Sequence, residues 1–90
     1  MSHTIQNKEQ LLARVRRIAG QVSAIEKALA SEDGCSTVLQ RITAARGALN
    51  GLMAEVVEEH LDTHVVEAKS ATSRRKAADE LLGIVRTYLK

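Results

Sequence analysis

The chain has 90 residues, which allows one small domain, and domains of this size often complete their hydrophobic core by oligomerisation. Hydrophobic residues make up 44% of it, yet Phe, Trp and Pro are absent and Tyr occurs once, so aliphatic helix seams are favoured and nothing interrupts a long helix. The net charge of +2 permits a nucleic-acid partner without requiring one, and a single cysteine excludes an internal disulfide framework. No stretch approaches the roughly 18 consecutive apolar residues of a membrane span, and the N-terminus lacks a signal-peptide core. We therefore expect a cytoplasmic protein of one domain, residues 1–90.

The first two predicted helices share one apolar pattern, with alternating steps of four and three residues, as in a coiled-coil seam. In the first helix, residues 7–29, the seam is Leu11, Val15, Ile18, Val22, Ile25 and Leu29. Residues 31–34, of sequence SEDG, predict a short turn between helices. In the second helix, which runs from Cys35 to about Leu61, the seam is Val38, Ile42, Ala45, Leu49, Leu52 and Val56.

The remainder of the chain predicts a linker and a third helix. Residues 66–73 are small, polar and without periodicity, which is typical of a linker. One stripe of the last helix would hold Ala77, Leu81, Ile84 and Tyr88. We predict an all-α, three-helix chain with a long central helix.

The central helix is too long to be covered by its own chain, since it would span about 40 Å at 1.5 Å per residue. Small residues gather near its middle, and such residues let two helix backbones approach closely. They are Ala44, Ala45, Gly47, Ala48 and Gly51. A kink in a surface helix is the alternative. We predict a homo-oligomer with this helix at the interface.

Two histidines, His60 and His64, stand four residues apart on the second helix and share one face. Taken alone, such a pair is also typical of a solvated helix end. Cys35 precedes His60 by 25 residues, about 37 Å along a straight helix, so one chain cannot bring them together. Two antiparallel copies of the helix can, and the midpoint of that pairing falls near residue 48, inside the small-residue patch. The sequence therefore predicts a metal site shared between subunits.

One thiolate with imidazoles suits Ni(II), Co(II) or Zn(II), whereas Cu(I) would favour a second sulfur. Removal of Met1 would leave the α-amine of Ser2 beside His3, which offers further nitrogen ligands. Higher coordination numbers suit nickel and cobalt, because a tetrahedral zinc site is full with four ligands. His3 is equally interpretable as a terminal residue without a role.

One face of the first helix is rich in long hydrogen-bond donors suited to phosphates and groove edges. That face holds Gln10, Arg14, Arg17 and Gln21. Lys8 and Arg16 lie nearby, and Arg41 and Arg46 of the second helix could extend it. A solvated charged face is the alternative. Because the chain has no aromatic platform for single strands, single-stranded RNA is not an expected target, and recognition would depend on the backbone and shape of double-stranded DNA.

No catalytic arrangement is found, so we expect a protein that is not an enzyme. A zinc-protease helix would need Glu directly after His60, where the chain has Leu61. Cys35 has no adjacent base in its own chain, and no glycine-rich phosphate loop occurs. A metal-binding bundle that never contacts DNA stays open as an alternative.

Nearly the whole chain resembles the small helical repressors that include the copper sensor CsoR, the nickel/cobalt sensor RcnR and the formaldehyde sensor FrmR. The most specific parts are residues 14–21 (RVRRIAGQ), Cys35, residues 45–53 (ARGALNGLM), His60 and His64. The resemblance implies an antiparallel helical-bundle dimer that assembles into a tetramer, a dimer of dimers. It also implies that the metal-free form binds operator DNA, and that an effector releases it and derepresses efflux or detoxification genes.

The opening MSHTI and the set His3, Cys35, His60 and His64 look most like the nickel/cobalt branch. Copper sensors carry a second Cys where this chain has His64, and persulfide sensors need two thiols. Formaldehyde sensors resemble it in the first helix, but their pattern has Pro after Met1 and an acid at position 64. The resemblance implies release by Ni(II) or Co(II). The alternative is a formaldehyde sensor in which the Ser2 amine and the Cys35 thiol are bridged.

Overall fold

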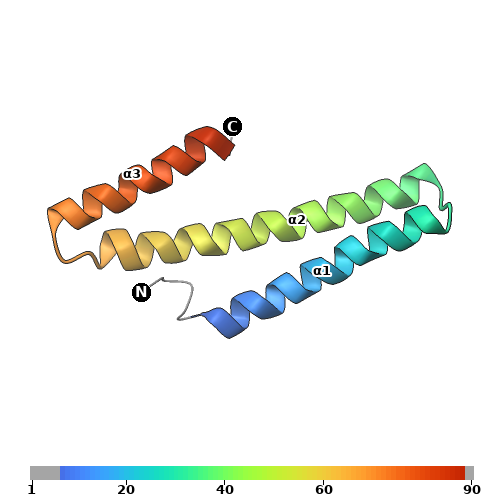
Figure 1. Ribbon diagram of the computed structural model, residues 1–90, viewed down its shortest axis with the longest axis horizontal. Coiled ribbons are helices and arrows are strands. Elements are labelled where there is room, and N and C mark those ends of the chain that lie inside the picture. The colour runs from blue at the N-terminus through green and yellow to red at the C-terminus, as the bar shows by residue number, and fades with distance from the viewer. Residues whose placement is uncertain (1–6, 89–90) are drawn as a thin grey trace. The chain divides into compact units, whose positions relative to one another are not determined.

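The computed structural model describes residues 7–88, in which helices follow one another and no strand occurs (Figure 1). Helix α1 spans Lys8–Ala30, α2 spans Cys35–His60 and α3 spans Ala71–Tyr88. A π-helical turn, η2, continues α2 over Leu61–Val66. The prediction of an all-α, three-helix chain with a long central helix is therefore confirmed.

The described chain forms two compact units, which we call the helical hairpin, Asn7–Ala54, and the C-terminal unit, from Glu55 onward. In the hairpin, α1 and the first part of α2 run antiparallel on either side of a short turn (Figure 1). The turn is tight: the amide of Asp33 donates to the carbonyl of Ala28 at 2.9 Å, and Glu32 takes the left-handed conformation with φ 54°. The turn predicted at residues 31–34 is confirmed.

The apolar seams of the hairpin divide into an inner and an outer line. On α1, Leu11 and Ile18 are buried, whereas Val15 and Val22 of the same apolar pattern are exposed, Val22 by 50%. The inner line is Leu11, Ile18 and Ile25 with Val38, Ala45 and Leu52, all buried or half-buried. The outer line is Val15, Val22 and Leu29 with Ile42 and Leu49, all exposed. Each line recurs every seven residues, so the predicted seam holds one set of contacts within the hairpin and leaves a second set uncovered.

The predicted linker is shorter than the sequence indicated. Helical structure continues through η2 to Val66, and α3 already begins at Ala71. The Ser73 amide donates to the Ser70 hydroxyl oxygen at 3.0 Å, so Ser70 caps α3. Serines typical of a loop thus start the helix. Within the C-terminal unit α3 packs against η2, with Ala77 buried. Between residues 7 and 88 no helix is both long and apolar enough to cross a membrane.

The cap at Ser70 gives a first prediction. Replacing Ser70 with Ala leaves the amide of Ser73 without its acceptor and should lower the free energy of unfolding by about 1 kcal/mol. Urea denaturation followed by circular dichroism at 222 nm measures the change. The matched control is Ser31→Ala, since the Ser31 hydroxyl forms no hydrogen bond within residues 7–88 and its loss should leave stability unchanged. Equal stability of both variants and the parent would show that α3 does not depend on this cap.

Candidate metal centre and nucleic-acid interface

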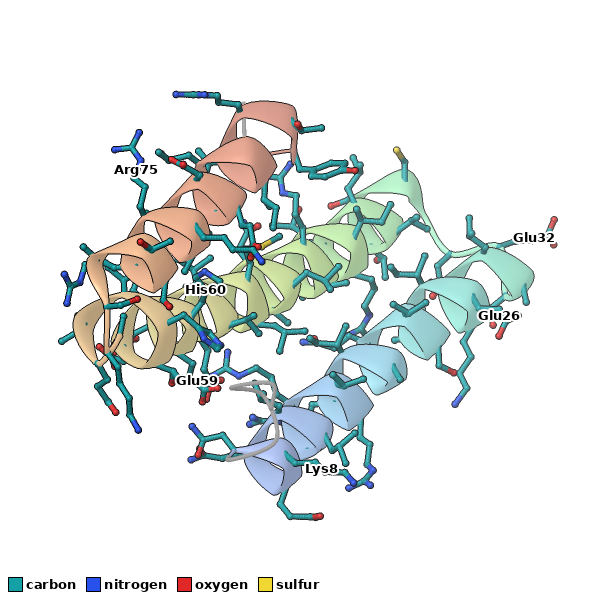
Figure 2. The ribbon with its side chains drawn as sticks, turned by 60° about the vertical axis from the view of Figure 1, so that its left-hand side comes forward. Lys8, Glu26, Glu32, Glu59, His60 and Arg75 are labelled. Atoms are coloured by element: carbon teal, nitrogen blue, oxygen red, sulfur yellow. The ribbon has the colours of Figure 1, made fainter. Side chains whose placement is uncertain are left out.

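His60 is the last residue of α2 and lies between the end of that helix and α3 (Figure 2). Its Nε2 atom is 3.1 Å from the carbonyl oxygen of Ala77 on α3. Because a carbonyl can only accept, Nε2 must donate, and in the neutral ring Nδ1 then carries the lone pair. Metal-ligating histidines commonly donate their second nitrogen to a backbone carbonyl in this way. His60 is therefore oriented as such a ligand would be.

His64 lies in η2, next to His60. The centroids of the two imidazole rings are 5.1 Å apart and the ring planes are tilted by 50°. Two metal–nitrogen bonds of about 2 Å each span about 4 Å between nitrogens, and this ring separation is compatible with that span. Both rings line a cleft of about 220 Å³ whose other walls are side chains of α3: Ser73, Lys76, Ala77 and Glu80. The two histidines thus fit a divalent ion, with one cationic and one anionic neighbour in the cleft.

The described residues do not complete this site. Between residues 7 and 88, no group of three or more His, Cys, Asp or Glu side chains is placed to hold a metal ion. Cys35, the first residue of α2, is exposed and lies at the opposite end of that helix from His60. Ser2 and His3 lie outside the described residues. A site that includes Cys35 therefore needs a second chain.

A second cleft lies in the helical hairpin and gathers three of the residues predicted to bind DNA. This cleft has a volume of about 210 Å³ and is lined by Arg14, Arg17, Ile18 and Gln21 of α1 and by Ala48 of α2. The amide oxygen of Gln21 is buried and has no hydrogen-bond partner among the described residues. The other predicted DNA ligands do not line this cleft and are exposed on the hairpin: Lys8, Arg16 and Arg46.

Gly51 has a role that the sequence analysis missed. A Cβ atom built on Gly51 would lie 2.6 Å from Nη1 of Arg14, so the missing side chain makes room for the guanidinium against α2. A Cβ atom built on Gly47, by contrast, would have no described atom within 4 Å apart from its own helix backbone and chain neighbours. The sequence places both glycines in the patch expected to contact a second copy of the helix, and Gly51 also faces Arg14 of its own chain. Arg14 and Gly51 each lie about 18 residues from the middle of the turn at residues 31–34, so they face each other across the hairpin, and this spacing could have revealed the contact.

Comparison with known proteins places the chain in a family. A family model described as a metal-sensitive transcriptional repressor matches residues 7–87. Transcriptional repressor RcnR of Salmonella typhimurium is 44% identical over 90 residues, covering all of both chains. An uncharacterized protein of Serratia marcescens, from the bioA 5′ region, is 48% identical over 91 residues, again covering all of both chains.

A solved structure agrees with this match. It is the formaldehyde-responsive regulator FrmR of Salmonella enterica serovar Typhimurium, in a variant with a glutamate-to-histidine change at its position 64. It shares 45% of its residues with this chain at a TM-score of 0.84, over 92% of this chain and 94% of that one. The chain belongs to the family of metal-sensitive transcriptional repressors.

Proposed function

We propose that this chain represses transcription by binding operator DNA without metal, and that Ni(II) or Co(II) at a site shared between subunits releases it. The observation that carries the proposal is the pairing of His60 and His64, with the His60 ring oriented by the Ala77 carbonyl, in a metal-sensitive repressor. We expect both functions in a single cytoplasmic domain, residues 1–90, whose metal would be an effector for efflux genes.

The proposed ligand set joins two chains. His60 and His64 of one subunit would bind the ion with Cys35 of another, and the Ser2 amine and His3 would add nitrogen ligands. A thiolate with several nitrogens suits nickel and cobalt, and Zn(II) is the next candidate. The exposed outer line of the hairpin supports a homodimer that assembles into a homotetramer, because it gives a second copy a seam with the same seven-residue repeat.

Operator DNA would bind on the hairpin. Arg14 and Arg17 supply guanidinium donors for phosphates, and Gln21 lines the same cleft beside them. Lys8, Arg16 and Arg46 add positive charge on exposed positions of the same hairpin. Cys35 directly follows the turn that joins α1 to α2, so a bond at its sulfur constrains the pair of helices that holds these arginines. For release, the effector must favour the DNA-free state, and about 1–3 kcal/mol of coupling is typical.

Formaldehyde sensing is the second candidate, favoured by the 45% identity to a formaldehyde-responsive regulator. Formaldehyde would link the Ser2 amine to the Cys35 thiol through one methylene group, with loss of one water. The related structure acquired a histidine at its position 64 by substitution, whereas this chain has His64 as its own residue. That residue supports the metal effector over the aldehyde. A metal-binding bundle without a DNA role is the third candidate.

Fluorescence anisotropy on labelled DNA from the protein's own upstream region tests the proposal. We expect Ni(II) or Co(II) to release the metal-free protein and formaldehyde to leave it bound. His64→Glu should weaken the metal response by about tenfold or more, since an imidazole ligand is lost, and Cys35→Ala should abolish it. Glu67→Gln, an exposed carboxylate outside the histidine cleft, is the matched control and should respond like the parent.

Other outcomes would select the alternatives. Release by formaldehyde alone, lost in Cys35→Ala, would make the protein an aldehyde sensor. Metal binding by a protein that never binds its upstream DNA would leave the bundle without a DNA role.

The contact between Gly51 and Arg14 predicts a pair of variants with opposite effects. Gly51→Ala and Gly47→Ala both gain helix propensity, worth up to about 1 kcal/mol, but only the first places a methyl group where the Arg14 guanidinium lies. Because that group is the flexible end of a side chain, it can move without unfolding the hairpin. We expect Gly51→Ala to bind DNA about tenfold more weakly at fixed salt, and Gly47→Ala to bind like the parent. If Gly51→Ala binds DNA with the affinity of the parent, the packing of Arg14 against Gly51 does not contribute to DNA binding.

The outer line predicts how the assembly can be broken. Leu49→Asp places a charge in the proposed intersubunit seam and should shift the molar mass, measured by light scattering after size exclusion, toward the 9.8 kDa of one chain. Gln40→Asp adds the same charge at an exposed polar position of α2 and should leave the assembly intact. A parent protein that is itself monomeric would contradict the shared metal site.

A further inference from the structure

The helical turn that carries His64 has an uncommon hydrogen-bonding pattern. Leu61–Val66 is π-helical, and the amide of Glu67 donates to the carbonyl of Asp62 at 3.0 Å, five residues back. π-Helical turns are rare, occur mostly as short insertions and are frequent at functional sites. A return to α-helical hydrogen bonding would change the position of His64 relative to His60. Something must therefore stabilise the wider turn.

Arg74 of α3 supplies hydrogen bonds where η2 ends. Its Nε donates to the carbonyl of Val65 at 3.0 Å, and its Nη2 donates to the carbonyl of Ala68 at 3.2 Å. The last carbonyls of a helix lack partners within the helix, and the amide of Ala68 reaches Val65 only at 3.4 Å. Hydrogen bonds from a charged donor are stronger than those between neutral groups. A single guanidinium therefore joins the last turn of η2 to the loop that follows.

The position of Arg74 in α3 makes this role more specific. Arg74 lies in the first turn of the helix, where a positive charge opposes the helix dipole, so its placement there is unfavourable unless carbonyls compensate it. Ala77, which accepts from His60, lies three residues further along and on the same face of α3. One face of α3 thus forms hydrogen bonds to residues on both sides of His64: to His60 before it and to Val65 after it.

We propose that Arg74 is a positioning residue of the histidine site: by holding the π-helical turn, it sets the 5.1 Å separation of the His60 and His64 rings. Arg74 does not line the cleft between the rings and need not touch a bound ion. It acts through the backbone that carries His64. The part of the inference that concerns metal binding rests on the proposed function, whereas the part that concerns ring separation does not.

The neighbouring residue provides a matched control. Arg75 is also a basic residue of the first turns of α3, but its side chain is 80% exposed. Among residues 7–88 it pairs only with Asp79, at 3.2 Å, along its own helix. In Figure 2 it extends away from the end of α2. Arg74→Met and Arg75→Met therefore remove the same charge and shorten the side chain equally. Only Arg74→Met removes the hydrogen bonds to the end of η2.

Two measurements on the metal-free full-length protein test the ring separation. Hydrogen exchange at the amides of Glu67 and Ala68 should be about tenfold faster in Arg74→Met and unchanged in Arg75→Met. Nuclear Overhauser effects between the His60 and His64 rings should weaken in Arg74→Met alone. Arg74→Lys, which keeps one charged donor, should recover part of both signals and serves as the test if Arg74→Met does not fold. Parent-like exchange and ring contacts in both Arg74 variants would overturn the proposal.

Cobalt titration then tests the link to the effector. We expect Arg74→Met to bind Co(II) about tenfold more weakly than the parent and with an altered ligand-field absorption spectrum. Loss of a residue that orients metal ligands commonly lowers metal affinity by about this much. Arg75→Met should match the parent in both. A parent that binds no cobalt would refute the proposed function, and the exchange and ring measurements would still decide the role of Arg74. An identical cobalt spectrum and affinity in Arg74→Met would overturn its link to metal binding.

Discussion

A continuous helix with a cysteine at its first residue and a histidine at its last constrains everything else in this molecule. Helix α2 has 26 residues, and its ends bear Cys35 and His60, so the two side chains of one chain can never bind the same ion. If both are ligands, the site exists only in an assembly. The hairpin has a surface suited to one, because the outer line from Val15 to Leu49 is left uncovered. Under the proposed function, the length of α2 therefore makes metal binding depend on oligomerisation.

The sequence predicted the helices and their packing positions because both follow from periodicity. Apolar residues at steps of three and four placed Leu11, Ile18 and Ala45 correctly on contact seams, and SEDG located the turn. Periodicity alone could not divide a seam into its inner and outer lines, since that depends on which neighbour each line meets. The start of α3 was misplaced because Ser70 and Ser73 favour loops and helix caps equally.

The residue types of the candidate sites could be predicted from the sequence, whereas the neighbouring residues that position them could not. The spacing of His60 and His64 suggested a pair, and the structure brings their rings within 5.1 Å. The π-helical turn leaves no pattern in the sequence, because it depends on hydrogen bonds from Arg74, a residue that looks like ordinary surface charge. The packing of Arg14 over Gly51 was hidden for a similar reason: a glycine shows where space is needed, without showing which neighbour fills it.

The division of the chain near Glu55 bears on how such proteins diversify. The hairpin contains Arg14, Arg17 and Gln21, while His60, His64 and their supports on α3 belong to the C-terminal unit. Substitutions beyond Glu55 can therefore replace donor atoms without altering the side chains proposed to read DNA. Under the proposed function, the hairpin keeps Cys35 and the DNA-reading side chains while changes beyond Glu55 alter the other donor atoms, so a lineage could acquire a new stimulus while it keeps its target gene.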